Sequence, residues 1–165
     1  MITKLLKGID TCSKLGAYLS ALSMILIVSL IVVEIICRAV FSVSTMIADE
    51  FSGYLMVVTV MAGLGYTLET DSHIRITILT TKLGPRARLC MDLLATCLAL
   101  AIALFVCYHA VLMVHDSYSY DMRADSISET PFYLPQLIVP LGLAGLILQL
   151  FGVLLRRCRR CSPNP

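Results

Sequence analysis

Four long apolar runs, separated by shorter polar segments, dominate the pattern of this chain. A transmembrane helix needs about 20 predominantly apolar residues, and each run approaches or exceeds that length. The clearest run extends over 51–68 and contains no charged residue. The pattern predicts an all-α integral membrane protein, a single domain over 1–165 with short tails. Its four transmembrane helices are expected at about 17–40, 51–68, 89–114 and 134–155.

The first apolar run follows Lys4, Lys7 and Lys14, a combination that also occurs in signal peptides. A signal peptide has a short apolar core and a cleavage site of small residues. The run over 17–36 is interrupted only by Glu34, and no A-x-A site follows it. We expect this segment to be retained as the first span.

Lys and Arg are distributed unevenly around the predicted spans. Eleven of the 13 lie in the two tails and the second connection, whereas Arg38 and Arg123 lie on the other side. Because basic residues are retained on the cytoplasmic side, this bias predicts that both termini are cytoplasmic. The eleven are Lys4, Lys7, Lys14, Arg75, Lys82, Arg86, Arg88, Arg156, Arg157, Arg159 and Arg160.

Composition agrees with a membrane protein. Hydrophobic residues make up 58% of the chain and charged residues 15%, and the mean hydropathy is +0.87. These values exclude an ordinary soluble domain, so the lipid bilayer is the expected surrounding. No basic tract is interleaved with aromatic residues, which argues against nucleic acid as a partner.

Two groups of charged residues lie close to the predicted outer surface. Glu34 and Arg38 are four residues apart on one helical face, in the order that favours an ion pair. The pair could simply neutralise an arginine at the interface, or it could tie this helix to a neighbour or a second protein. Asp49 and Glu50 open the second span and offer Arg38 an alternative partner.

The second connection, over 69–88, places His73 and Arg75 before a short alternation of isoleucines. We interpret it as an interfacial segment, with a short strand as the alternative. The outer loop over 115–133 holds four acidic residues against Arg123 alone, and tyrosines could anchor its ends at the interface.

Small residues mark candidate helix contacts, because they let backbones approach closely in a membrane. Span two carries Gly53, Gly63 and Gly65. Pro135 suits a helix start, and Pro140 should kink or loosen the next turn. In span four, one small and polar face is expected to pack against another helix; it consists of Gly142, Gly145, Gln149 and Gly152.

Candidate chemistry is sparse. His109 lies deep in span three, and we expect a structural residue with a satisfied ring rather than a haem ligand, because no other span has a histidine. Cys158 and Cys161 have C-x-x-C spacing but no second ligand pair, so no metal or cofactor is expected there. No hydrolase, zincin or phosphate-loop motif is present, so the chain is not expected to be an enzyme.

Taken together, these features resemble a family of transporter subunits. They are Arg38 at the end of the first helix, Asp49 and Glu50 at the start of the second, Gly63 and Gly65, His73-Ile74-Arg75, Pro85-Arg86, and Pro135, Pro140 and Gly142. Over about 17–155 the chain is similar to the small membrane subunit (DctQ type) of tripartite ATP-independent periplasmic (TRAP) transporters.

This resemblance implies a role in a three-part transporter of the bacterial inner membrane. A periplasmic solute-binding protein would capture an organic acid, and a large permease subunit would move it with a sodium gradient. The small subunit would support the large one in the bilayer and bind no cofactor of its own. Two alternatives from other classes are a four-helix redox protein carrying haem or quinone, and a small autonomous channel or exporter.

Overall fold

The computed structural model describes residues 2–44, 47–69, 84–126 and 128–161. Its elements are α1 (Ile2–Phe41), α2 (Ile47–Glu69), α4 (Pro85–Ser119), the short α5 (Tyr133–Gln136) and α6 (Ile138–Cys161). Helices α1, α2 and α4, and α5 with α6 as one span, make 4 segments long and apolar enough to cross a membrane. The predicted all-α fold with four transmembrane helices is confirmed.

The helices extend beyond the predicted spans. Helix α1 begins at Ile2 rather than near residue 17, and α4 covers 85–119 rather than 89–114. Hydropathy marks only the part of a helix that suits hydrocarbon, whereas the backbone continues as helix through the polar ends. At 1.5 Å per residue, α1 is about 60 Å long. Since a bilayer core is about 30 Å thick, α1 must tilt or protrude from it.

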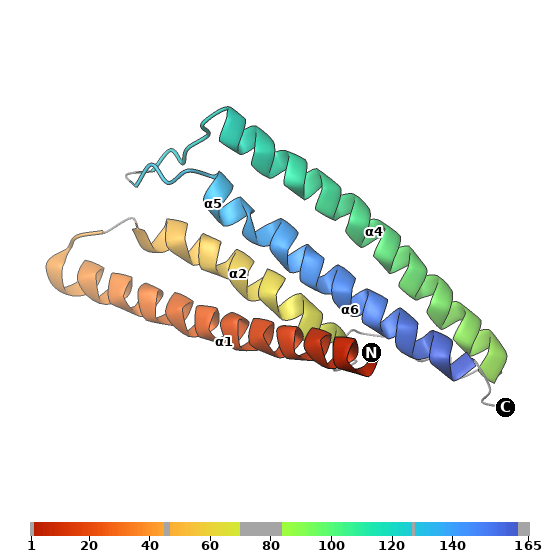
Figure 1. Cartoon of the computed structure of the whole chain (residues 1–165). Coiled ribbons are helices and arrows are strands. Elements are labelled where there is room, and N and C mark those ends of the chain that lie inside the picture. Colours follow the sequence, from red (N-terminus) through yellow and green to blue (C-terminus); the bar gives the residue numbers. More distant parts are fainter. Residues whose placement is uncertain (1, 45–46, 70–83, 127, 162–165) are drawn as a thin grey trace.

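The four long helices form an open layer in the order α1, α2, α6, α4 (Figure 1). The principal contacts join α1 to α2, α2 to α6, and α6 to α4. In a closed four-helix bundle the two outer helices would also pack together, but here α1 and α4 lie at opposite edges. The layer therefore leaves much helix surface to be covered by lipid or by another protein.

Helix α1 packs against α2 through a line of small residues. Ser13, Gly16, Ser20 and Ser23 follow one another at spacings of three and four, which places them on one helical face. A Cβ atom at Gly16 would collide with the carbonyl oxygen of Ala62. Small side chains therefore set the distance between these two helices.

The facing side of α2 contributes two of the glycines that were predicted to pack. A Cβ at Gly63 would lie 3.3 Å from Ser20 Oγ, and one at Gly65 would lie 3.1 Å from Ser13 Oγ. Ser20 Oγ also donates a hydrogen bond of 2.7 Å to the carbonyl oxygen of Thr59. Gly53, by contrast, has no neighbouring atom within 4 Å of such a Cβ and is not a packing position inside this chain.

The last span is interrupted near its start, as Pro140 predicted. Helix α5 ends at Gln136 and α6 begins at Ile138. Proline lacks the N–H that would bond the carbonyl four residues earlier, here that of Gln136. The chain continues through Leu137, whose carbonyl accepts a hydrogen bond of 3.3 Å from the Leu141 N–H. The interruption therefore deflects the helix without unfolding it.

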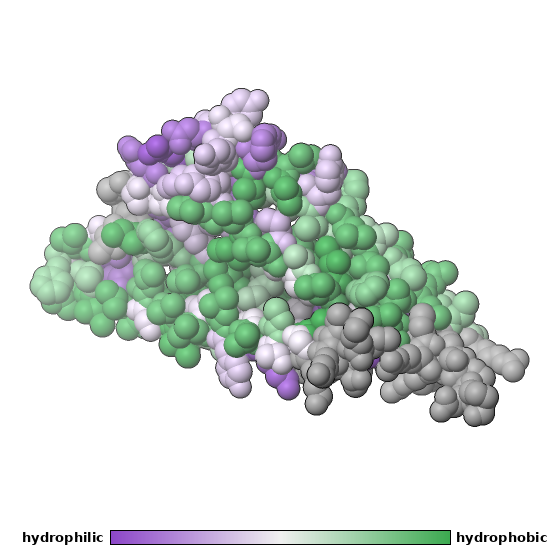
Figure 2. Space-filling view, viewed as in Figure 1, coloured by the Kyte–Doolittle hydropathy of each residue, from purple (hydrophilic) through white to green (hydrophobic). Residues whose placement is uncertain are grey.

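The outer surface of the layer is apolar along the helices and polar at one end (Figure 2). Large side chains on α1 and α4, such as Val33 and Leu98, are 57% and 58% exposed. We call the end that carries Asp49, Glu50 and the loop over 120–132 the acidic end. We call the opposite end, where α1 begins and α6 finishes, the basic end. This division is the one expected for a protein that crosses a bilayer.

Candidate functional site

The acidic end is organised around the predicted pair of Glu34 and Arg38. Arg38 Nε donates a hydrogen bond of 2.7 Å to Glu34 Oε1. A second carboxylate, that of Asp49, approaches the same guanidinium, with Nη2 and Oδ2 at 3.7 Å. The prediction left open which carboxylate holds Arg38, and the structure shows that Glu34 and Asp49 both contribute. Arg38 thus links α1 to the start of α2.

Burial of Glu34 depends on the connection between α1 and α2. The chain turns at Ser42, which has a positive φ of 54°, and runs back along the last turns of α1. Ser44 Oγ then donates a hydrogen bond of 2.9 Å to Glu34 Oε1. As a result Glu34 is only 5% exposed, whereas the side chain of Arg38 remains 52% exposed. No periodic pattern along the chain indicates the contribution of Ser44.

Glu50 has a different role from its neighbour Asp49. Tyr54, one turn along α2, donates a hydrogen bond of 2.7 Å from its hydroxyl to Glu50 Oε1. Ser128, in the outer loop, donates one of 2.6 Å to Glu50 Oε2. Glu50 therefore anchors that loop to α2 instead of pairing with Arg38. The partners are 78 residues apart, so no local sequence pattern indicates this contact.

The outer loop has a defined backbone over its described residues. The Ala124 N–H donates to the carbonyl of Thr130, and the Phe132 N–H donates to that of Met122, each at 3.0 Å. The loop closes like a small hairpin, with an ion pair of 3.1 Å between Arg123 and Asp121 on its surface. Its two ends are joined by the rings of Tyr118 and Tyr133, whose centroids are 5.5 Å apart.

Part of the small and polar face of α6 packs against other helices of the same chain. A Cβ at Gly142 would lie 2.5 Å from the Cβ of Met61 on α2. Gln149 is 1% exposed and Gly152 is buried, as expected for a face that packs against helices. Gly145 differs, because nothing lies within 4 Å of a Cβ built there. The prediction that this face meets another helix holds for Gly142.

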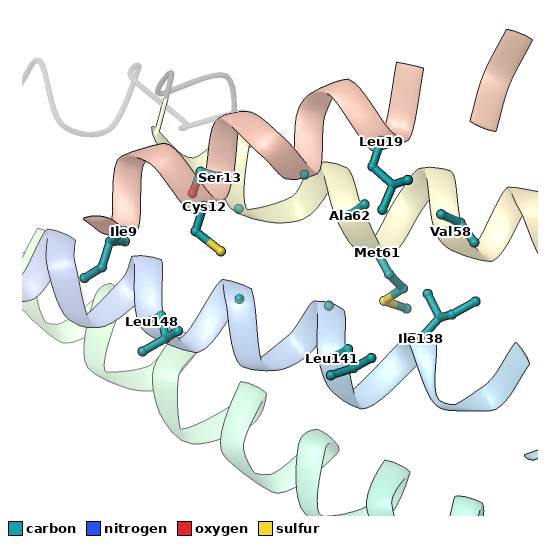
Figure 3. Close-up of a pocket in the computed structure, with 14 residues that line it drawn as sticks. Ile9, Cys12, Ser13, Leu19, Val58, Met61, Ala62, Ile138, Leu141 and Leu148 are labelled. Atoms are coloured by element: carbon teal, nitrogen blue, oxygen red, sulfur yellow. The ribbon is translucent and has the colours of Figure 1, made fainter. Parts of the chain in front are cut away.

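Gly145 borders a groove of about 390 Å³ between α1, α2 and α6 (Figure 3). Leu19, Val58 and Leu148 contribute apolar side chains from the three helices, while Cys12 and Ser13 supply the few polar atoms. None of the described residues that line it is charged. An organic anion bound there would have no cation to neutralise it, so the groove suits an acyl chain or an apolar side chain better than a carboxylate.

At the basic end, α1 and α6 are joined by an ion pair that the sequence analysis did not anticipate. The guanidinium of Arg156 contacts the carboxylate of Asp10, and both side chains are partly exposed. The pair shows that the start of α1 and the end of α6 lie side by side. His73 and Arg75 lie outside the described residues, and the side chains of Cys158 and Cys161 are also not described.

His109 was expected to be a structural residue with a satisfied ring. Its side chain is exposed on α4, and it contacts the rings of Phe105 and Tyr108, with centroids 4.5 and 5.4 Å away. The described residues provide no hydrogen-bond partner for its nitrogens. The buried alanines of α4 lie on another face of the helix, at Ala103 and Ala110, which are 5% and 6% exposed.

Comparison with known proteins agrees with this architecture. Residues 27–160 match the family model for the DctQ component of tripartite ATP-independent periplasmic transporters. A Haemophilus influenzae protein named "Putative TRAP transporter small permease protein" is 25% identical over 121 residues, which are 73% of each chain. The family match covers the last part of α1, including the Glu34–Arg38 pair, and the three later spans, with α6 complete except for its last residue. This multi-pass membrane protein therefore belongs to the DctQ family, the small permease subunits of TRAP transporters.

Proposed function

We propose that this chain supports the large permease subunit of a sodium-driven TRAP transporter for organic acids. In this role it would lie in the bacterial inner membrane with both termini in the cytoplasm. A solute-binding protein would deliver the substrate from the periplasm. Sodium coupling and substrate recognition would belong to the other components, and this chain would bind no cofactor and catalyse no reaction.

The open layer is the observation that carries this proposal. In the most apolar part of each span, only 6% to 22% of the residues are buried. A protein that transports on its own must enclose a polar pathway, usually with charged or polar groups at mid-membrane depth. The groove between α1, α2 and α6 has no charged lining residue and lies at the surface of the layer. An accessory role requires just such accessible helix faces.

Reconstitution tests the proposal directly. Liposomes containing this chain alone should take up no radiolabelled organic acid when a sodium gradient is imposed. Liposomes containing this chain, the large permease and the solute-binding protein should show uptake, and those lacking only this chain should lose it. Uptake by the isolated chain would contradict the accessory role, and unimpaired uptake without it would contradict the supporting role.

A further inference from the structure

The exposed face of α4 carries the imidazole ring of His109 among apolar side chains that would suit contact with lipid. His109 lies five residues before Val114, where the uncharged part of α4 ends ahead of His115 and Asp116. At 1.5 Å per residue this is about 7.5 Å inside the apolar part of the helix. His109 therefore lies within the candidate membrane span rather than at its end. Ionisable residues at this depth almost always face protein or a water-filled cavity.

The residues around His109 form a regular line along α4, which we call the α4 seam. Its members follow one another at spacings of four, three, four and three, the repeat by which one helix packs along another. It lies on a different side of α4 from the buried Ala103 and Ala110. The α4 seam consists of Leu98 (58% exposed), Ile102 (55%), Phe105 (64%), His109 (exposed) and Leu112 (40%).

At the other edge of the layer, an exposed polar side chain on α1 is satisfied by its own helix. Ser29 is exposed on α1, and its hydroxyl donates a hydrogen bond of 2.9 Å to the carbonyl of Ile25 on the same helix. Its polar group is therefore satisfied without a partner from outside. The described residues give His109 no such bond to its own helix, and its ring contacts with Phe105 and Tyr108 supply no hydrogen bond to its nitrogens.

We propose that a transmembrane helix of the large permease subunit packs along the α4 seam and presents a hydrogen-bonding side chain to His109. Acyl chains would cover the apolar members of the seam but would offer nothing to the imidazole. A carboxylate, hydroxyl or amide on a partner helix would satisfy it in a setting that excludes water. This inference rests on the proposed function, which supplies the partner, and it adds the face and the residue through which the partner binds.

Photo-crosslinking locates the partner. In the co-expressed transporter, Ile102→p-benzoylphenylalanine on the α4 seam should yield an adduct with the mass of this chain plus the large subunit. The control, Ile25→p-benzoylphenylalanine, probes the α1 edge, where Ile25 is 62% exposed, and should yield several-fold less of that adduct. An adduct of two copies of this chain, lipid adducts alone, or equal yields at both positions would each overturn the proposal.

A second experiment tests His109 itself. Hydrogen bonds between transmembrane helices average about 0.6 kcal/mol and reach about 1.7, so His109→Leu should weaken retention of the large subunit roughly threefold or more. His109→Gln keeps a donor and an acceptor and should recover part of the loss. His115→Leu, on the same helix but beside Asp116 at its acidic end, is the matched control and should behave like the unaltered chain.

The two experiments separate this inference from the proposed function. If the unaltered chain does not retain the large subunit, the supporting role fails. If the unaltered chain retains the large subunit, two results would contradict only the proposal for the α4 seam. One is the lack of a specific adduct from the α4 seam, and the other is normal binding of the large subunit by His109→Leu. All variants must first elute and unfold like the unaltered chain when purified alone, so that a loss of folding is not mistaken for a loss of binding.

Discussion

At the scale of single residues, Glu34 and Arg38 form one ion pair but differ in how far they are exposed. Glu34 is 5% exposed, while the side chain of Arg38 is 52% exposed and also faces Asp49. Removing the arginine leaves a carboxylate in a site from which water is largely excluded. Removing the glutamate leaves a cation that water and Asp49 can still stabilise. The two halves of the pair should therefore differ in how much stability their loss costs.

We expect Arg38→Met to lower the free energy of unfolding more than Glu34→Gln does. Arg38→Met removes the cation beside a buried carboxylate, whereas Glu34→Gln leaves a cation that water still solvates. The double variant should recover part of the larger loss. Unfolding of the purified chain in mixed detergent micelles measures all three. Losses that simply add would show that the two side chains do not interact.

Two glycines on α6 offer a second residue-scale comparison. A Cβ at Gly142 would lie 2.5 Å from Met61 Cβ and 2.8 Å from the Met61 carbonyl oxygen, whereas one at Gly145 would meet nothing within 4 Å. We expect Gly142→Ala to destabilise the chain by about 1–3 kcal/mol through overpacking. Gly145→Ala should be neutral or stabilising, because alanine favours helix. The same unfolding measurement tests both variants. Equal losses of stability would contradict the close packing of α6 against α2 at Gly142.

At the scale of elements, Glu50 connects α2 to the outer loop over 120–132. Its carboxylate accepts hydrogen bonds from Tyr54 and from Ser128, so the loop is held to a helix that lies far from it in the sequence. Ser128 lies in the sequence between Ala124 and Phe132, whose N–H groups make the hairpin hydrogen bonds of the loop. Loss of the carboxylate should therefore loosen the loop while leaving the helices intact.

Hydrogen–deuterium exchange of the purified chain tests this link. Glu50→Ala should accelerate exchange in peptides that contain the amides of Ala124 and Phe132, with no change in the core of α4. Asp49→Ala is the matched control, since Asp49 is 85% exposed and its ion pair is with Arg38 rather than the loop. Equal acceleration by both variants, or by neither, would show that Glu50 does not anchor the loop.

At the scale of the whole molecule, the chain ends meet at one end of the layer. The ion pair of Asp10 and Arg156 places the start of α1 beside the end of α6. An even number of spans requires only that the two lie on the same side of the membrane, and it does not say which side. The bias of Lys and Arg predicts that the basic end is cytoplasmic.

Thiol labelling checks this orientation. In variants that keep only Cys12, Cys158 or Cys161, a membrane-impermeant reagent should not label sealed spheroplasts but should label them after permeabilisation. A cysteine introduced by Ser119→Cys, at the acidic end of α4, should be labelled while the cells are sealed. Labelling of Cys158 or Cys161 in sealed cells would reverse the proposed topology.

Much of this protein could be predicted because a bilayer acts on each segment separately. The free energy of transferring a helix into lipid is nearly a sum over its own residues, so hydropathy alone identified four spans. The pair of Glu34 and Arg38 depends only on helical geometry at a spacing of four residues, which is also local. Gly63 and Gly65 could be assigned to packing because small residues favour close helix contact in a membrane.

The sequence by itself thus determined the all-α class, the number of spans, the local ion pair and the resemblance to small TRAP permease subunits. Only the tertiary structure decided the open order α1, α2, α6, α4, the anchoring of the outer loop by Glu50, and the exposure of His109. The reason is that every face of these helices is apolar enough for lipid, so hydropathy does not distinguish a face that meets a helix from one that meets acyl chains. Close packing of particular side chains, such as Gly142 against Met61, makes that distinction.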